Sequence, residues 1–392
     1  MELLGGVPFV LTNVPQSLLS YSCLNPIYGT TINAYKCDRT AGGSSGGEGS
    51  LIACGGSIIG IGGDVGGSLR FPAHFNGITS LKRSGTSVMG RSLVDASLGP
   101  MTRTVRDAVT FLKIFWSERW FFRGDPYLPA IYWDDHQYLN KQPLRIGYYY
   151  QDGWFEPTPA LKRAVQETHS RLEKLGHVLV EFEPPDMADA FKLFLGAILV
   201  DDGKYILDKF DKVLQEIFIF LVIITRIIFE TRIFGKIVKP FWPRLSKVCE
   251  AFALNTSEMR QMFEDIAKYR HRFVREMKAL RLDAIICPIQ VVPAIEHFYP
   301  MKLISTVSYC GLFNLLDFPA GTVKVTEVSE IDELCLKDYP ENDLWEKLVK
   351  KATKDSVGLP VGVQVASFPF HEETVLRLLA EIEKSVELEK II

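Results

Sequence analysis

The chain has 392 residues, of which 47% are hydrophobic and 23% are charged, and its formal net charge at pH 7 is -3. This composition is typical of a globular protein that buries a sizeable core, as one large domain or two smaller ones. No basic run with interleaved aromatic residues occurs, so nucleic acid is excluded as a partner.

Cysteine usage and the N-terminal sequence bear on the compartment. The seven cysteines include no Cys-x-x-Cys pair, which indicates reduced, buried thiols rather than a disulfide framework. Met1 is followed by Glu2 and a short apolar run without a basic region, so no signal peptide is predicted. We therefore expect a cytosol-facing protein.

The N-terminal part predicts a short strand over residues 6–12 (GVPFVLT), which polar turn residues close. Between residues 49 and 61, small and apolar residues predict a packed helix that is interrupted at Gly55 and Gly56 and followed by a turn over residues 62–67. The spacing of apolar residues predicts another helix over residues 103–116.

The rest of the chain predicts an alternation of strands and helices. Gly176 lies where a helix C-cap requires a left-handed residue. Strands are predicted at 144–150, 178–182, 282–293 and 357–366, and helices at 159–175 and 371–385. This order of elements indicates an α/β layered fold.

Glycine is concentrated in one segment of the chain. Twelve of the thirty glycines lie in residues 41–68, which end within the sequence GGDVGGSLRFP. A folded chain uses glycine where the backbone takes left-handed angles or approaches a ligand closely. Apolar residues inside the segment, such as Ile52 and Ile59, argue against a solvated linker.

Two phosphate-binding motifs based on glycine-rich loops are excluded. The P-loop requires a lysine after its last glycine, whereas the segment ends in GGSLR. The dinucleotide fingerprint G-x-G-x-x-G fails because Gly60 and Gly62 place Val65 at the third glycine position. We expect no nucleotide, metal or other cofactor.

What remains is a serine that is presented by successive backbone amides. The amides of Val65, Gly66, Gly67 and Ser68 lie in a flexible turn where they can converge on a developing oxyanion, and each aimed donor lowers the barrier by about 3 kcal/mol. Acyl transfer by Ser68 is therefore the sharpest hypothesis. The esterase pattern G-x-S-x-G is absent here, and a lone nearby histidine such as His74 is typically a packed or surface residue.

Several motifs together resemble the amidase signature family, and within it the enzymes that act on fatty-acid amides. The segment AGGSSGGEGSLIACGGSIIGIGGDVGGSLRFPAHFNGI resembles the signature itself. The resemblance extends over essentially the whole chain through TNVPQS (12–17), LGPMTR (98–103), LDFPAG (316–321) and SVGLPVGVQ (356–364). It implies an α/β amidase-signature fold, a mixed β-sheet core surrounded by many α-helices, formed by residues 1–392 as one domain.

The resemblance also implies the roles of individual residues in a Ser-Ser-Lys mechanism. Ser68 is expected to be the nucleophile that forms the acyl-enzyme, and Ser44 is expected to pass its proton to the base. The amides of residues 65–68 are expected to form the oxyanion hole. Leu18, beside Leu19, is expected to contact the acyl chain of the substrate, and Ser44 to contact the substrate as well.

The family's catalytic lysine has no counterpart in the expected place. In the family it lies upstream of the serine pair in a Gly-Val-Pro-x-x-x-Lys context, whereas here the corresponding residue is Thr12, and Lys36 is the one lysine before Ser44. The base must be a neutral amine, which a lysine supplies when burial or charge lowers its pKa. The resemblance therefore predicts a member without its N-terminal third, and an impaired amidase.

Residues 217–229 (IFIFLVIITRIIF) form the most apolar run of the chain. Because a bilayer span needs about twenty apolar residues, no transmembrane helix is predicted. The run fits a helix buried in the core, or a monotopic cap that dips into one leaflet with Trp242 at headgroup level. The resemblance favours the cap, as an insertion over residues 205–245.

The leading hypothesis is a serine amidase that hydrolyses fatty-acid amides at a membrane surface, on the cytosolic side of an endomembrane. One alternative is a catalytically inactive, membrane-associated protein that binds lipid amides. Another is an amidase for small polar amides, which the apolar Leu18 and Leu19 disfavour. The assembly is left open, with a homodimer as one outcome.

Overall fold

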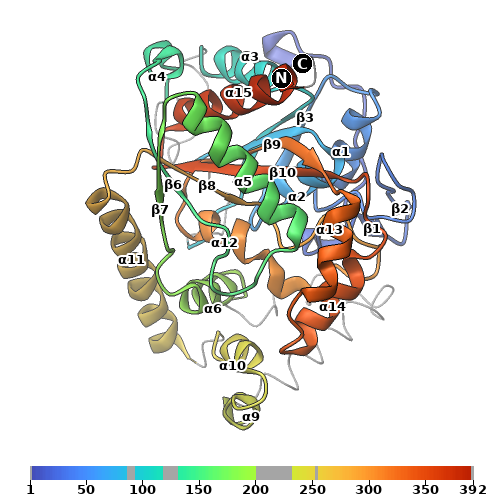
Figure 1. Ribbon diagram of the computed structural model, residues 1–392, viewed down its shortest axis with the longest axis vertical. Helices are drawn as coiled ribbons and strands as arrows, with labels where there is room; N and C mark the ends of the chain where they lie inside the picture. Colours follow the sequence, from blue (N-terminus) through green and yellow to red (C-terminus); the bar gives the residue numbers. More distant parts are fainter. Residues whose placement is uncertain (1, 86–92, 118–130, 200–231, 252–254, 390–392) are drawn as a thin grey trace.

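The computed structural model describes residues 2–85, 93–117, 131–199, 232–251 and 255–389 of the chain. At its centre is an eight-stranded mixed sheet with the strand order β3-β5-β4-β9-β10-β8-β6-β7, and helices pack on both faces of it (Figure 1). The predicted α/β class, with a mixed sheet core surrounded by helices, is confirmed.

Pairing within the sheet is antiparallel from β3 to β8, whereas β8, β6 and β7 run parallel to one another. A separate two-stranded ribbon pairs β1 (Leu24–Asn25) with β2 (Gly29–Thr30). The strands of the main sheet are β3 (Ile59–Asp64), β4 (Thr79–Lys82), β5 (Ser97–Thr102), β6 (Arg145–Tyr148), β7 (Val178–Glu181), β8 (Ala284–Pro288), β9 (Ala320–Glu327) and β10 (Pro360–Ser367).

Alternate residues of a strand point to opposite faces of the sheet, and two positions show which helices cover each face. A methyl group on Gly321 of β9 would meet Leu379 of α15. On the other face, Gln364 of β10 is hydrogen-bonded to Arg70 of α2. The first face carries α3 (Val105–Ser117), α5 (Pro159–Lys174) and α15 (Glu372–Glu389), and the second carries α1 (Gly46–Ala53), α2 (Arg70–Asn76), α6 (Met187–Ile198) and α12 (Ser308–Leu315).

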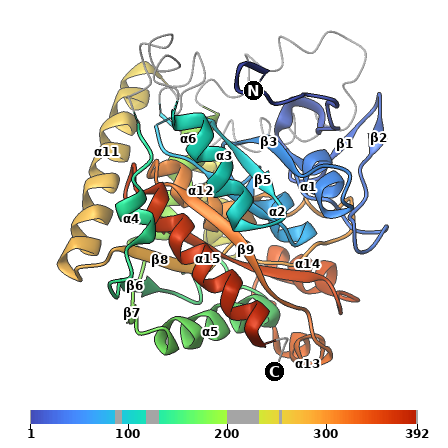
Figure 2. The same ribbon diagram turned by 90° about the horizontal axis from the view of Figure 1, so that it is seen from above.

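The remaining helices lie around these layers. Figure 2 shows α11 on the side of the molecule opposite to α1, β1 and β2. The remaining helices are α4 (Asp135–Leu139), α9 (Arg232–Val238), α10 (Pro243–Cys249), α11 (Thr256–Ala279), α13 (Glu330–Cys335) and α14 (Leu344–Thr353). The short 3-10 turns are η1 (Glu2–Leu4), η2 (Gln16–Leu18), η4 (Ile304–Val307) and η5 (Leu336–Asp338).

Most of the predicted elements are confirmed. The strand-helix-strand unit appears as β6, α5 and β7, and Gly176 has the expected left-handed φ of 94° after α5. The predictions for residues 103–116, 357–366 and 371–385 correspond to α3, β10 and α15. All seven cysteines are free, and four of them are buried.

Three predictions at the level of elements are wrong. Residues 6–12 form no strand, because they have no strand partner within the described chain, and Leu11 is 99% exposed. The helix of the glycine segment ends at Ala53, since Gly55 takes a φ of 80°, and residues 59–61 belong to β3. The strand predicted over residues 282–293 is limited to β8, which pairs only as far as Pro288.

The predicted insertion over residues 205–245 falls partly outside the described residues. The apolar run 217–229 lies outside them entirely, and the described remainder is α9 and the start of α10. Within the described ranges, every helix is too short or too polar to cross a bilayer.

Candidate active site

Ser68 lies in a tight turn that joins the end of β3 to the start of α2. Its side chain is half-buried. Asp64, the last residue of β3, holds the turn from inside by accepting hydrogen bonds from the amides of Gly67 at 2.8 Å and Leu69 at 3.2 Å. The turn that carries Ser68 is therefore fixed by one carboxylate.

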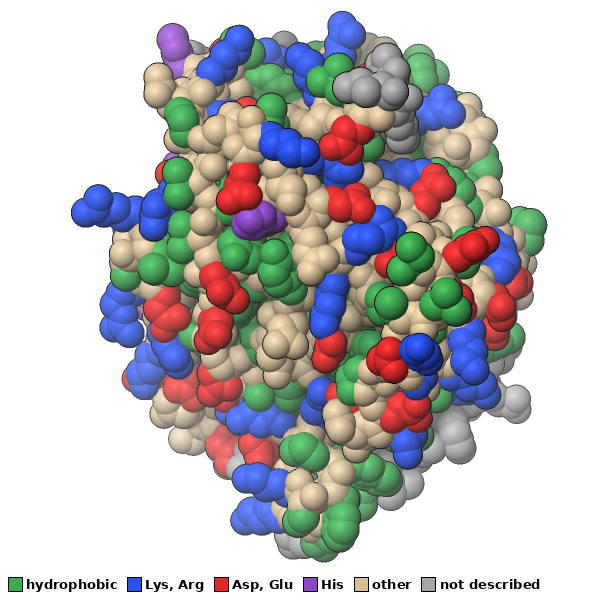
Figure 3. Space-filling view, viewed as in Figure 1, with side chains coloured by type: hydrophobic (Ala, Val, Ile, Leu, Met, Phe, Trp, Pro, Cys, Tyr) green, Lys and Arg blue, Asp and Glu red, His purple; other side chains and the backbone are tan. Residues whose placement is uncertain are grey.

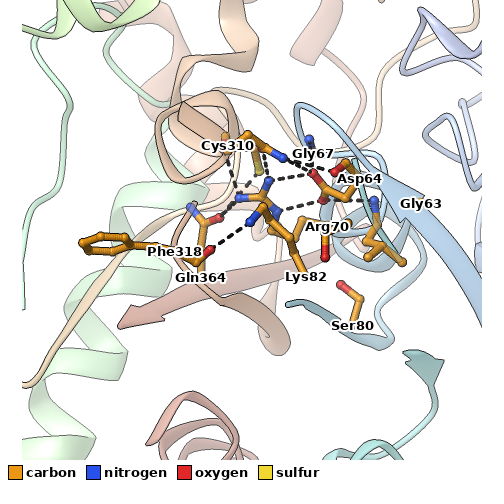
Figure 4. Close-up of polar contacts among 12 residues, drawn as sticks. Gly63, Asp64, Gly67, Arg70, Ser80, Lys82, Cys310, Phe318 and Gln364 are labelled. Atoms are coloured by element: carbon orange, nitrogen blue, oxygen red, sulfur yellow. Dashed lines mark hydrogen bonds and ion pairs between the residues drawn. The ribbon is translucent and has the colours of Figure 1, made fainter. Parts of the chain in front are cut away.

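Arg70, the first residue of α2, forms a buried ion pair with that carboxylate (Figure 4). Its Nε donates to Asp64 Oδ2 at 2.9 Å and its Nη2 to Asp64 Oδ1 at 2.8 Å. Its remaining donors reach Gln364 Oε1 at 2.7 Å, the Cys310 carbonyl at 3.1 Å and Asn314. A guanidinium satisfied on all sides in this way ties the turn to β10 and α12.

The charges of this pair stabilise each other. Burial alone would raise the pKa of Asp64, but the neighbouring Arg70 and the hydrogen bonds from Arg70 and Asn314 hold it at about 2. Burial alone would lower the pKa of Arg70, and Asp64 raises it above its ordinary value. Both groups therefore stay ionised behind the turn.

The backbone amides of the turn differ in their availability. The amide of Gly67 donates inward to Asp64. The sequence-based expectation that this amide faces the substrate is therefore not met. The amides of Val65, Gly66 and Ser68 have no hydrogen-bond partner within the described part of the chain. Three of the four amides predicted to form the oxyanion hole therefore have no hydrogen bond to the described residues.

The loop that carries Ser44 packs directly against this turn. The amide of Ser45 donates to the Ser68 carbonyl at 3.2 Å, and the side chain of Asn76 donates to the Ala41 carbonyl at 2.7 Å. Gly42 has a φ of 80°, and a methyl group on it would lie 2.7 Å from the Cα of Pro72. Only glycine allows so close an approach between the loop and α2.

The structure distinguishes the two serines of the pair. Ser44 is 7% exposed, and its hydroxyl makes no hydrogen bond to any described residue, Ser68 included. The Ser45 hydroxyl accepts from the Gly63 amide at 3.2 Å and donates to the Gly63 carbonyl at 3.4 Å. Ser45 therefore ties the loop to β3, whereas the Ser44 hydroxyl takes no part in holding the loop to the described residues.

Leu18 lies in the segment that enters this loop. It is 56% exposed and has a φ of 61°, at the end of a 3-10 turn. Farther along the segment, the carbonyl of Ser20 lies against Gly43. Leu18 therefore lies on an exposed stretch, two residues before Ser20, which contacts the loop that carries Ser44.

Lys36 and His74, which lie near Ser44 and Ser68 in the sequence, make structural contacts elsewhere. Lys36 donates to the Asp355 carbonyl at 2.7 Å. His74 accepts from the Gly362 amide through Nδ1, its Nε2 lies 3.3 Å from the Val292 carbonyl, and burial lowers its pKa to about 4. His74 is therefore a packed neutral residue.

Lys82 is a buried amine that sequence reasoning missed. Its Nζ donates to the Phe318 carbonyl at 3.0 Å (Figure 4). It also donates to the Arg83 carbonyl at 3.2 Å, and a carboxylate oxygen of Asp317 lies 3.9 Å away. Burial lowers its pKa, which the negative charge of Asp317 partly offsets. Because its protons are bound to carbonyl oxygens, Lys82 supports the loops behind the turn.

Sequence reasoning also missed the Asp64–Arg70 pair. The signal was available, because two opposite charges stand on either side of an apolar, glycine-rich turn, and a buried charge requires a partner. The partners Asn314 and Gln364 are far away in the sequence and carry no such signal.

Comparison with known proteins shows the family to which the chain belongs. The family model described as Amidase matches residues 1–376. "Fatty acid amide hydrolase 1" of Caenorhabditis elegans is 46% identical over 396 residues, which cover 98% of this chain and 69% of the relative. "Fatty-acid amide hydrolase 1" of Sus scrofa is 39% identical, with the same two coverages.

Solved structures share the fold. One described as "Fatty acid amide hydrolase" superposes with a TM-score of 0.77 at 23% identity, covering 95% of this chain and 64% of its own. A 6-aminohexanoate cyclic dimer hydrolase superposes with a TM-score of 0.67 at 19% identity, covering 95% and 74%. The chain thus spans about two thirds of the solved structure that is described as fatty acid amide hydrolase. The chain belongs to the amidase signature family of amide-bond hydrolases.

Proposed function

We propose that this chain is a serine amidase for fatty-acid amides, with Ser68 as the nucleophile and Ser44 as the proton relay. The observation that carries the proposal is the joining of the two serine segments through the Ser45 amide and the Ser68 carbonyl. The relatives named as fatty-acid amide hydrolases support the substrate class, because they match 98% of this chain.

In the proposed reaction, Ser68 Oγ attacks the carbonyl carbon of the amide and gives its proton to Ser44, which passes its own hydroxyl proton to a base, either an amine or, more slowly, a water molecule. The free amides of Val65, Gly66 and Ser68 stabilise the oxyanion that forms. The C–N bond then breaks, the amine leaves with the proton that Ser44 returns, and an ester on Ser68 remains. Water hydrolyses this ester to the fatty acid and restores the serine.

The relay requires a base that accepts the proton from Ser44. Lys36 is the one lysine before Ser44 in this sequence, and its bond to the Asp355 carbonyl commits it elsewhere. We propose that this chain reacts slowly because no amine of the described residues is hydrogen-bonded to Ser44, and that the oxyanion donors and Ser68 provide residual catalysis.

We expect the chain of 392 residues to hydrolyse a long-chain primary amide such as oleamide, and to do so about 10²-fold or more below the C. elegans relative, since general acid–base catalysis contributes this much. Release of oleate, measured for both proteins and for the Ser68→Ala variant, checks this. Equal turnover by the two proteins would show that a base has been overlooked, and unchanged release by Ser68→Ala would overturn the proposal.

We further propose that the helices α9 and α10 contact a membrane surface. Phe241 is 76% exposed between them, and Ile237 and Trp242 are also exposed. Lys236 and Lys239 are exposed beside them. Figure 3 shows apolar and basic side chains together at the end of the molecule where α9 and α10 lie. Aromatic and cationic side chains in this combination suit the headgroup layer.

We expect the protein to float with liposomes, and the double variant Phe241→Ser/Trp242→Ser to partition to them about 10²-fold less or weaker still. Each large apolar side chain removed from the interface costs about 1.5–3 kcal/mol of partitioning. The matched control is Ile331→Ser/Leu334→Ser on α13, which removes two other exposed apolar side chains. An equal loss in the control would remove α9 and α10 as the contact.

A further inference from the structure

Phe194 of α6 packs against the oxyanion turn, although it belongs to none of the motifs of the sequence. Its side chain is 3% exposed. A methyl group on Gly66 would lie 2.8 Å from Phe194 Cζ, and one on Gly311 of α12 would lie 3.0 Å from Cε1. The ring therefore fills a slot between two glycines, one in the turn and one in α12, where α6 and α12 pack together (Figure 1).

Hydrogen bonds hold three of the four peptide planes of the turn. Asn314 donates to the Asp64 carbonyl at 3.2 Å, which fixes the plane that carries the Val65 amide. The Gly67 amide is bound to the Asp64 side chain at 2.8 Å. The Gly67 carbonyl accepts from the Phe71 amide at 2.7 Å, which fixes the plane that carries the Ser68 amide.

The fourth plane lies between Val65 and Gly66 and carries the Gly66 amide. Neither the Val65 carbonyl nor the Gly66 amide has a hydrogen-bond partner in the described ranges. The ring of Phe194 is the group that approaches Gly66 closely. Gly66 has no left-handed φ, so the ring is the steric reason for a glycine at this position.

We propose that Phe194 is a positioning residue that sets the direction of the Gly66 amide toward the oxyanion. This inference rests on the proposed function of Ser68. Removal of one aligned oxyanion donor costs about 10²–10³ in rate. A smaller side chain at position 194 leaves the donor present but free to rotate, so we expect a loss of about 10- to 100-fold in acylation.

The test compares Phe194→Leu with Phe191→Leu. Phe191 is on the same helix, is also buried, and stacks on Trp154 at 5.3 Å between ring centroids. Both substitutions remove the same atoms from the same aromatic cluster, in which the two rings lie 6.3 Å apart. We expect both to lower the melting temperature similarly, and Phe194→Leu alone to slow labelling of Ser68 by a fluorophosphonate and to lower kcat with KM unchanged.

An equal slowing in both variants, or a change confined to KM, would overturn the positioning role. Hydrogen exchange gives a readout without the reaction: the peptide spanning residues 62–70 should exchange faster in Phe194→Leu than in Phe191→Leu. Unaltered exchange in Phe194→Leu would refute the inference even where Ser68 is reactive. If Ser68 is not labelled in the chain without substitutions, the proposed function is overturned. The contact between Phe194 and Gly66 then has no role in catalysis.

A rescue experiment tests the contact itself. Gly66→Ala should lower the melting temperature because its methyl group meets the Phe194 ring, and Phe194→Leu should relieve part of that loss. Residues in contact give non-additive effects, whereas separated residues do not. Gly66→Ala combined with Phe191→Leu should therefore be additive. Additivity in both pairs would show that the ring does not occupy the slot.

Discussion

Replacement of Arg70 by methionine is expected to cost about 3–5 kcal/mol of unfolding free energy, because it leaves the Asp64 carboxylate buried without its partner. Both side chains of this pair are fully buried. The same variant should slow acylation of Ser68, because Asp64 also binds the amides of Gly67 and Leu69. Urea denaturation and the rate of fluorophosphonate labelling measure the two effects.

Two control variants distinguish the loss of the buried ion pair from the loss of a positive charge elsewhere on the protein. Arg272→Met breaks the contact with Glu276 on α11, where the Arg272 side chain is exposed and that of Glu276 partly exposed, and such an ion pair contributes about 1 kcal/mol or less. Arg70→Lys keeps the charge but not the forked geometry, so it should restore only part of the stability. A loss in Arg70→Met no larger than in Arg272→Met would contradict the bracing role.

The pH range of this effect follows from the pKa of Asp64. Because the pKa is held at about 2, below its ordinary value of 3.8, the contribution of the pair is fully present above pH 3.8. It is lost as the pH falls toward 2, where the folded protein takes up the proton.

Replacement of Ser44 by alanine is expected to lower the acylation rate by about 10²-fold at most, the low end of the range for a lost proton-transfer group, because the relay in this chain works without its amine base. Stability should hardly change, because the Ser44 hydroxyl has no bond to the described residues. Labelling kinetics of Ser68 and thermal melting in parallel provide the measurement.

Ser45→Ala is the matched control for this prediction. The Ser45 hydroxyl makes two hydrogen bonds to the backbone of Gly63, so its loss should cost about 1 kcal/mol of stability. Its effect on acylation should be smaller than that of Ser44→Ala. The reverse order of the two rate effects would assign the relay to Ser45.

Elements with strong local patterns were predictable from the sequence. α3, α5 and α15 have a clear apolar face, and Gly176 ends α5 as expected. β3 was not predicted, because its sequence IGIGGD has half its residues as glycine and its pairing with β5 depends on residues 97–102. Residues 6–12 show the opposite case, since a strand-like pattern forms no strand without a partner.

The site was predictable only as far as its motifs extend. Ser44 and Ser68 were found from the signature, and the structure places their segments in contact. The inward direction of the Gly67 amide follows from the position of the Asp64 side chain, which the sequence of the turn does not specify. Phe194 was missed because a phenylalanine on an apolar helix face is ordinarily core, and its contact with Gly66 is purely tertiary.

Mass-spectrometric mapping of the residue that a fluorophosphonate modifies is the most direct test of the central claim, that the braced turn presents Ser68 as a nucleophile. The expected result is a single adduct on the peptide containing Ser68, absent in Ser68→Ala and formed more slowly in Arg70→Met. A folded protein that carries no adduct, or carries it on another residue, would contradict the claim.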